Sequence, residues 1–318
     1  MPPKVSVIIP VYGVEKYIER CARSLFEQTL DSIEYLFIND CTPDKSIDIL
    51  KNVLDEYPNR ETQVRIINMP HNSGQAKVRE VGIKSATGEY IIHCDSDDWV
   101  DKDMYRAMYE KAKQENADLV YCDYFTTDGQ TKKDKKENKK NICDKEYIIE
   151  QILEGKIHGG LWRLMSARSL YTQNDIHYPT INMCEDVALN LQLIYHSKRK
   201  IIWLNNTYYY YFQNNVNAIT KQRNISIQRL VKQQYIELID WLKSTDFKKK
   251  DLFILLLKLQ TRLYLNPFLK QIEIYKEWWH TYPEITGHIV PNKFIPAKIK
   301  IRYLLGLTRL YPALWKSD

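Results

Sequence analysis

Acidic residues in short clusters are the side chains of this sequence best suited to chemistry. Asp95 and Asp97 form an Asp-x-Asp pattern within the acidic segment 95–98. Carboxylate oxygens suit Mg²⁺ and Mn²⁺, and these ions commonly bridge protein carboxylates to substrate phosphates. The pattern alone is weak support for a metal site, because aspartate-rich turns are also common caps. Asp40 and the neighbours Glu185 and Asp186 are further acidic sites.

The elements that must position these acids alternate between strands and helices over the first hundred residues. Short apolar runs predict strands at 5–9, 33–38, 64–67 and 90–94, and apolar residues at near-helical spacing predict helices at 14–28, 46–57 and 75–86. This alternation favours a parallel, doubly wound sheet with right-handed crossovers. Ligands of such sheets bind beyond the carboxyl ends of the strands, which is where Asp40 and Asp95 stand.

The middle of the chain continues with mixed elements. The pattern predicts helices at 103–116, 145–154 and 187–195, and strands at 119–124 and 203–212, the last of them rich in aromatic residues. The tract 132–140 contains six lysines and two acids. We expect this tract to be a solvated loop, and attraction of phosphate groups is the alternative.

From about residue 225 the patterns become long and helical, which predicts a separate C-terminal helical region. Its last part, within 293–318, is a basic amphipathic pattern. Basic residues stand on one stripe (Lys298, Arg302, Arg309, Lys316) and apolar residues on the opposite face (Ile299, Tyr303, Leu307, Leu310, Leu314). Such a helix either lies on an anionic membrane surface or packs on the protein core, and the pattern leaves both open.

Composition excludes several classes of protein. The 318 residues are 44% hydrophobic and 27% charged, which excludes a disordered, a collagen-like or a disulfide-scaffold protein. The net charge of +6 arises from abundant charges of both signs, so we expect no nucleic-acid partner. The six cysteines are scattered, and we find neither a signal peptide nor an apolar run long enough to span a bilayer. We therefore expect a cytoplasmic protein, with the inner face of the cell membrane as an alternative location.

Several short motifs occur in a fixed order, and together they are specific. They are Pro-Val-Tyr at 10–12, Asn-Asp-Cys-Thr-Pro-Asp at 39–44, Asn-Ser-Gly at 72–74 followed by Arg79, Asp-Ser-Asp-Asp at 95–98, Leu-Trp-Arg-Leu at 161–164 and Glu-Asp at 185–186. This set closely resembles the family 2 glycosyltransferases of the GT-A fold, of the bacterial polysaccharide type.

The resemblance implies an α/β fold, in which helices flank a mostly parallel, Rossmann-like central sheet and a helical region follows. It implies a glycosyltransferase domain at 1–224, with a nucleotide-binding half at 1–100 and an acceptor half at 101–224. The helical region would be 225–318.

The resemblance also implies a role for individual residues. The nucleotide-sugar would contact Pro10, Val11, Tyr12, Asp40, Arg79, Asp95 and Ser96. Asp97, together with Asp95, would bind the Mg²⁺ or Mn²⁺ that bridges the diphosphate. Asp186 would be the catalytic base, and Glu185 and Trp162 would lie on the acceptor side.

The expected activity is inverting, metal-dependent transfer of a sugar from a nucleotide-sugar to a glycan or lipid-linked acceptor in surface polysaccharide biosynthesis. A UDP-sugar is the expected donor, and the enzyme class is hexosyl- or N-acetylhexosaminyltransferase. A glycosidase would need two carboxyls flanking the scissile bond, whereas here the acids divide into a metal-and-nucleotide set and one distant base. A catalytically silent nucleotide-sugar-binding or scaffold protein of the same fold is the alternative. A sugar nucleotidyltransferase and a dinucleotide dehydrogenase are disfavoured, because their glycine-rich loops are missing.

Some positions depart from the family pattern. Asn39 and Cys41 replace the usual Asp and Gly, and Glu80 adds a negative charge where Asn is common. A third, histidine-type metal ligand has no clear counterpart; the candidates are His158, His177 and His196, each of which we expect to be a structural or a surface residue. The rings of Trp162 and of 208–211 either stack on sugars or pack within the sheet.

Overall fold

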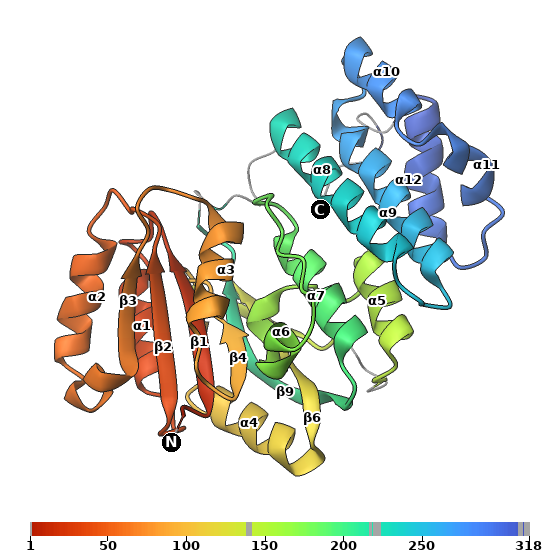
Figure 1. Cartoon of the computed structure of the whole chain (residues 1–318). Coiled ribbons are helices and arrows are strands. Elements are labelled where there is room, and N and C mark those ends of the chain that lie inside the picture. Colours follow the sequence, from red (N-terminus) through yellow and green to blue (C-terminus); the bar gives the residue numbers. More distant parts are fainter. Residues whose placement is uncertain (1, 138–141, 216–217, 219–223, 311–313, 315–318) are drawn as a thin grey trace. The chain divides into compact units, whose positions relative to one another are not determined.

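The computed structural model of the chain describes residues 2–137, 142–215, 218, 224–310 and 314. Contacts within the chain separate two compact units, Met1–Ala218 and Ile219–Asp318. The first unit holds the sheet and its helices, and the second is helical (Figure 1). A glycosyltransferase domain over 1–224, its halves at residue 100 and a helical region over 225–318 remain proposals.

A nine-stranded mixed sheet organises the first unit, in the order β3-β2-β1-β4-β8-β6-β9-β5 with β7 paired to β6. Its strands are β1 (Val5–Val11), β2 (Ile33–Asn39), β3 (Val64–Asn68), β4 (Tyr90–His93), β5 (Trp99–Val100), β6 (Ala117–Thr127), β7 (Lys132–Lys135), β8 (Leu164–Ala167) and β9 (Lys200–Phe212). Strands β3, β2, β1 and β4 are parallel, as the β-α alternation predicts. Strand β8 is antiparallel to both of its neighbours, β4 and β6, and β9 runs parallel to β6.

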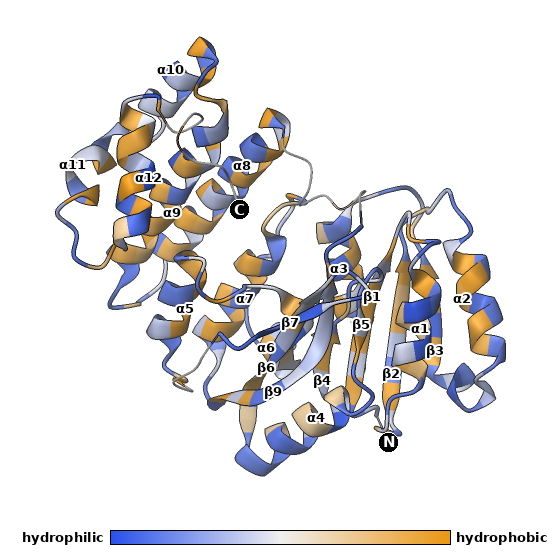
Figure 2. Cartoon of the chain, turned by 180° about the vertical axis from the view of Figure 1, so that it is seen from behind, coloured by the Kyte–Doolittle hydropathy of each residue, from blue (hydrophilic) through white to orange (hydrophobic). Residues whose placement is uncertain are grey.

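Helices flank the sheet and bury apolar side chains. They are α1 (Ile18–Phe26), α2 (Ser46–Asp55), α3 (Gln75–Ser85), α4 (Met104–Glu115), α5 (Lys145–Leu153), α6 (Ser169–Thr172) and α7 (Glu185–His196). In α1, for example, Ile18, Cys21 and Leu25 are buried at helical spacing. Figure 2 shows β1 and β2 largely orange, whereas α1 and α2 carry both colours. Strands that are buried on both faces read as continuous apolar runs.

The expectation of a loop at 132–140 is wrong for its first residues. Lys132–Lys135 forms β7, which pairs antiparallel with the end of β6. The Lys132 ammonium lies 4.4 Å from the centre of the Phe125 ring, and Glu137 accepts hydrogen bonds from the Tyr124 hydroxyl (2.7 Å) and the His158 amide (2.7 Å). These contacts with distant residues order the tract, and a local charge pattern cannot show them. Residues 138–141 lie outside the described part of the chain.

The second unit contains α8 (Ile225–Lys243), α9 (Lys250–Leu265), α10 (Ile272–His280), α11 (Thr286–Ile289) and α12 (Ala297–Leu307). Its core includes the buried Trp278 and Tyr303 around Arg262, whose guanidinium bonds the Trp278 carbonyl and the Tyr303 hydroxyl. Among the described residues no helix has the length and hydropathy needed to cross a bilayer.

The C-terminal amphipathic pattern is only partly a helix. Helix α12 ends at Leu307, and Arg309 has a left-handed backbone (φ 60°), so the pattern does not continue as one helix to its end. Ile299 and Tyr303, which belong to the predicted apolar face, are buried in this unit. That part of the pattern therefore packs on the protein, whereas Leu310 and Leu314 are exposed. Lys316 lies outside the described residues.

Candidate active site

The carboxyl ends of three neighbouring parallel strands bring the predicted nucleotide residues to one edge of the sheet. The register pairs Val11 with Asn39 and Ile8 with His93, so Tyr12, Asp40 and Asp95 follow adjacent strand ends. Val11 is fully buried, whereas Tyr12 is 50% exposed. The Tyr12 ring is thus open to a flat ligand, and the Val11 side chain is not.

Asp40 is tied to the start of α3. Its carboxylate accepts hydrogen bonds from the amides of Ser73 (2.7 Å) and Gly74 (2.8 Å), and the side chain is buried. Gly74 has φ +82°, and a Cβ there would lie 2.0 Å from Asn182 Nδ2. The Asn182 oxygen in turn accepts the amide of Ala76 (3.0 Å). Only glycine fits this turn, which explains the Asn-Ser-Gly motif.

The acidic segment 95–98 is anchored to β9. The Tyr209 hydroxyl accepts the Asp95 amide (3.1 Å) and donates to Asp98 (2.7 Å), and the Phe212 amide donates to the other Asp98 oxygen (2.7 Å). Burial and the charges of Asp97 and Asp95 raise the pKa of Asp98 well above its ordinary value. Asp98 therefore has a structural task, and Ser96 beside it is buried.

Arg79 of α3 joins the two acidic sites. Its fully buried guanidinium lies 2.9 Å from Asp95 Oδ1, 3.0 Å from Asp186 Oδ1 and 3.5 Å from Glu185 Oε1. These charges raise the pKa of Arg79 although burial alone would lower it. The Arg79 side chain is fully buried, and a contact between Arg79 and the nucleotide stays a prediction. It is a cation that joins the carboxylates of Asp95, Asp186 and Glu185.

Asp186 stands in the first turn of α7, where the helix dipole favours a negative charge. Burial nevertheless raises the pKa of Asp186 to about 7, with the Arg79 charge opposing the shift. Burial also raises the pKa of Glu185. A carboxylate with a pKa near neutrality is a better proton acceptor than an ordinary one.

The Asp97 carboxylate forms no ion pair with a described residue, although the Arg20 charge acts on it. Its carboxylate accepts the Asn215 amide group (Nδ2 to Oδ2, 2.8 Å), and the Arg20 guanidinium bonds only its main-chain carbonyl (2.9 Å). Burial, and then the Asp95 charge, raise the pKa of Asp97. Neighbouring hard oxygen donors with excess negative charge fit Mg²⁺ or Mn²⁺. The described residues contain no group of three His, Cys, Asp or Glu side chains that could hold a metal.

Other predicted residues pack within the protein. Trp162 is 1% exposed, with its ring stacked near Tyr209 (4.4 Å between centroids) and Tyr211 (5.6 Å). The Trp162 ring therefore packs within the protein, and its place on the acceptor side stays a prediction. Glu80 is paired with Lys77 (2.8 Å) and Lys84 (2.5 Å), which compensates its extra charge.

The sequence did not predict a place in the site for His93 and Asn215, nor the hydrogen bonds of Tyr209. The buried His93 lies 3.3 Å from the Arg79 guanidinium, and burial lowers its pKa well below the ordinary value. Tyr209 and Asn215 belong to β9 and its end, more than a hundred residues from the aspartates that they bond. His93 stands two residues before Asp95, and this position could have indicated that it belongs to the site. No local pattern indicates Asn215.

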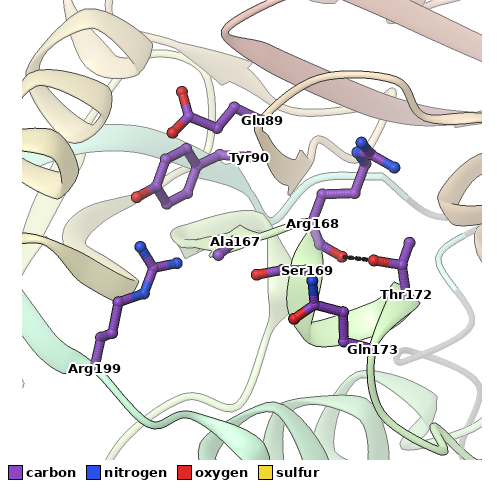
Figure 3. A pocket seen from close by; sticks show the side chains of 8 residues that line it. All are labelled: Glu89, Tyr90, Ala167, Arg168, Ser169, Thr172, Gln173 and Arg199. Atoms are coloured by element: carbon purple, nitrogen blue, oxygen red, sulfur yellow. Dashed lines mark hydrogen bonds between the residues drawn. The ribbon is translucent and has the colours of Figure 1, made fainter.

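A separate pocket of about 270 Å³ lies at the opposite edge of the sheet. It is lined by residues at the start of β4, the end of β8 and the start of β9, among them Tyr90, Arg168 and Arg199 (Figure 3). Its arginines are engaged: Arg199 pairs with Asp118 (2.7 Å), and Arg168 bonds the Gly88 carbonyl (2.8 Å). It shares no residue with the acidic site.

A family model and a curated relative match this chain. The family model described as glycosyl transferase family 2 matches residues 6–172. A Bacillus subtilis (strain 168) protein, "Uncharacterized glycosyltransferase EpsJ", is 31% identical over 227 residues, which are 70% of this chain and 64% of that protein. The matched segment thus spans less than two thirds of that relative.

Two solved structures share the fold. TarS 1–349 of S. aureus in complex with UDP-GlcNAc has a TM-score of 0.72 at 18% identity, covering 98% of this chain and 87% of that chain. The mannosyltransferase PcManGT of Pyrobaculum calidifontis in complex with GDP-Man and Mn²⁺ has a TM-score of 0.57 at 14% identity, covering 100% and 89%. The expected GT-A fold with a C-terminal helical region is confirmed.

Proposed function

Because the chain belongs to glycosyl transferase family 2, we propose that it transfers a sugar from a nucleotide-sugar, most consistently a UDP-sugar, to a hydroxyl of a glycan or lipid-linked glycan in surface polysaccharide biosynthesis. One observation carries the proposal: buried Arg79 bridges Asp95 on the donor side and Asp186 on the acceptor side. The UDP-GlcNAc in a structure of the same fold supports the donor class.

On the donor side, Tyr12 would stack on the base, and Asp40 with the 72–74 turn would face the nucleoside. Asp95 and Asp97 would hold Mg²⁺ or Mn²⁺, which would neutralise the negative charge that develops on the leaving diphosphate. The Mn²⁺ present with the donor in PcManGT supports this choice of ion.

On the acceptor side, Asp186 would take the proton of the acceptor hydroxyl. The hydroxyl oxygen forms a bond to the anomeric carbon while the bond from that carbon to the diphosphate oxygen breaks. A single displacement of this kind inverts the anomeric configuration. Arg79 would keep Asp186 in place, and Glu185 would shape the acceptor pocket from the neighbouring position.

We propose further that the protein works on the cytoplasmic face of the cell membrane, with contact through 293–318. The contact would use the exposed apolar side chains Phe294, Ile301, Leu304, Leu310 and Leu314. Lysines of the same segment, Lys293, Lys298 and Lys300, would add attraction to anionic lipids.

A turnover assay tests the proposal. The protein is incubated with Mn²⁺ and UDP-sugars in turn, with a lipid-linked glycan pool as acceptor, and UDP release is followed. We expect release with one donor, loss of turnover in Asp186→Asn with donor binding retained, and a product of inverted configuration by NMR. Donor binding without turnover in the wild-type protein would favour the silent-scaffold alternative.

A further inference from the structure

Asn215 is a polar side chain placed against the acidic segment by β9. The three tethers that join β9 and its end to 95–98 are the Tyr209 hydroxyl, the Phe212 amide and the Asn215 carboxamide. Asn215 is 7% exposed, and its Nδ2 lies 2.8 Å from Asp97 Oδ2. The carboxamide is therefore held at the Asp97 carboxylate, which forms no ion pair with a cationic side chain of the described residues.

The negative charges around Asp97 favour the binding of a cation. Asp95 and Asp98 are its acidic neighbours, Arg79 pairs with Asp95, and Arg20 reaches only the main chain of Asp97. The amide of Asn215 supplies a partial positive charge from its NH₂ end. A cation placed at Asp97 would replace that interaction, and the same carboxamide would then present its oxygen after a half-turn about its terminal bond.

The described residues contain no group of three His, Cys, Asp or Glu side chains that could hold a metal, so no histidine joins two of the aspartates as a third ligand. The His158 ring is buried beside Trp162 (5.1 Å between centroids) and its Nδ1 accepts the Gly160 amide. His177 lies in the loop before α7, and His196 ends α7 at the far end from Asp186. His93 lies against Arg79.

We propose that Asn215 is the third protein ligand of the divalent cation, so that the protein donors are all oxygens: Asp95, Asp97 and the Asn215 carboxamide. This inference rests on the proposed function, which supplies the cation. An all-oxygen set is the set that Mg²⁺ prefers, whereas an imidazole would favour later transition metals. The site is therefore selective for Mg²⁺ and Mn²⁺ and discriminates poorly between them.

Binding of Mn²⁺ in the presence of UDP, followed by electron paramagnetic resonance, tests the inference without turnover. We expect Asn215→Ala to weaken Mn²⁺ binding about tenfold, the order found when groups that support a metal site are removed. Asn215→His should raise the affinity for Mn²⁺ or Co²⁺ relative to Mg²⁺. Asn214→Ala is the matched control, because Asn214 is exposed and bonds the Asp128 carbonyl.

The outcomes separate the two proposals. Unchanged Mn²⁺ affinity in Asn215→Ala, with an unchanged Mg²⁺-to-Mn²⁺ ratio in Asn215→His, would overturn the role of Asn215 and leave the proposed function intact. Failure of the wild-type protein to bind Mn²⁺ with any nucleotide would overturn the proposed function itself. If Asn215→Ala does not fold, the ratio of Mg²⁺ to Mn²⁺ affinity in Asn215→His decides whether Asn215 is a ligand.

Discussion

At the scale of single residues, the site depends on a buried charge balance around Arg79. One guanidinium faces three carboxylates, so its removal leaves negative charges buried without a partner. We predict that Arg79→Met lowers the free energy of unfolding by about 3 kcal/mol in urea titrations. Arg106→Met, which removes an exposed pair with Asp103, should change it by less than about 0.5 kcal/mol. Equal effects of the two substitutions would contradict the bridging role.

The protonation of Asp186 gives a second prediction at this scale. Burial raises its pKa to about 7, so the free protein should carry a neutral Asp186 at pH 6 and an ionised one at pH 8. The base must be ionised to accept a proton, and kcat/KM should therefore rise with pH through a midpoint of about 7 and then level off.

The measurement is ¹³C NMR of aspartate carboxyls, compared with Asp186→Asn to assign the resonance. A midpoint near 4 for that resonance would show that the carboxylate is less desolvated than the structure indicates. The NMR midpoint and the midpoint of the kcat/KM profile should agree, because kcat/KM reports the groups of the unliganded enzyme.

At the scale of elements, β9 determines the conformation of the acidic segment. Tyr209→Phe removes a donor to Asp98 and an acceptor for the Asp95 amide. Because Asp98 would stay buried with one hydrogen bond fewer, we predict a loss of about 2 kcal/mol in unfolding free energy. Nucleotide affinity should fall as well, because the segment that carries Asp95 and Asp97 loosens. Tyr208→Phe is the control, and the prediction fails if it is equally destabilising.

The sequence predicted most elements of the first unit because their signals are local. Apolar runs identified β1 and β2, and helical spacing identified α1 and α3. Strand β7 was missed, since a lysine tract has no strand pattern and is ordered by contacts with Phe125, Tyr124 and Arg163. The antiparallel place of β8 between β4 and β6 also depends on pairing across the sheet.

The motifs predict which residues form the candidate site, but not the contacts between them. Asp95, Asp97 and Asp186 were identified from motifs, and the structure gathers Asp95 and Asp186 around Arg79. The structure adds what motifs cannot give: the full burial of Arg79, the tether of Asp98 to Tyr209, and the contact between Asp97 and Asn215. All three depend on long-range packing, which a single sequence does not display.

At the scale of the whole molecule, the two units differ in their surfaces. All but one of the large hydrophobic side chains that are exposed in the described chain belong to the second unit, and Tyr12 is the exception. An apolar surface mixed with lysines is typical of proteins that bind anionic membranes. In α12 the exposed stripe contains Ile301 and Leu304, on the side of the helix away from buried Ile299 and Tyr303.

We predict that the double substitution Ile301→Glu with Leu304→Glu lowers binding to anionic phospholipid vesicles at least about tenfold, because it removes apolar burial and adds repulsion. Sedimentation with vesicles measures the bound fraction. Ile236→Glu, at an exposed position of α8, is the control and should bind like the wild-type protein. Unchanged binding of the double variant would contradict membrane contact through α12.

Cation-dependent nucleotide binding at Asp97 is the central prediction for this protein. Calorimetry should compare UDP, GDP, CMP and dTDP, with and without Mn²⁺, in the wild-type protein, Asp97→Ala and Asp186→Asn. We predict Mn²⁺-dependent binding of UDP, its loss in Asp97→Ala and its retention in Asp186→Asn. Binding of no nucleotide in the presence of Mn²⁺, or equal binding by the wild-type protein and Asp97→Ala, would contradict the account.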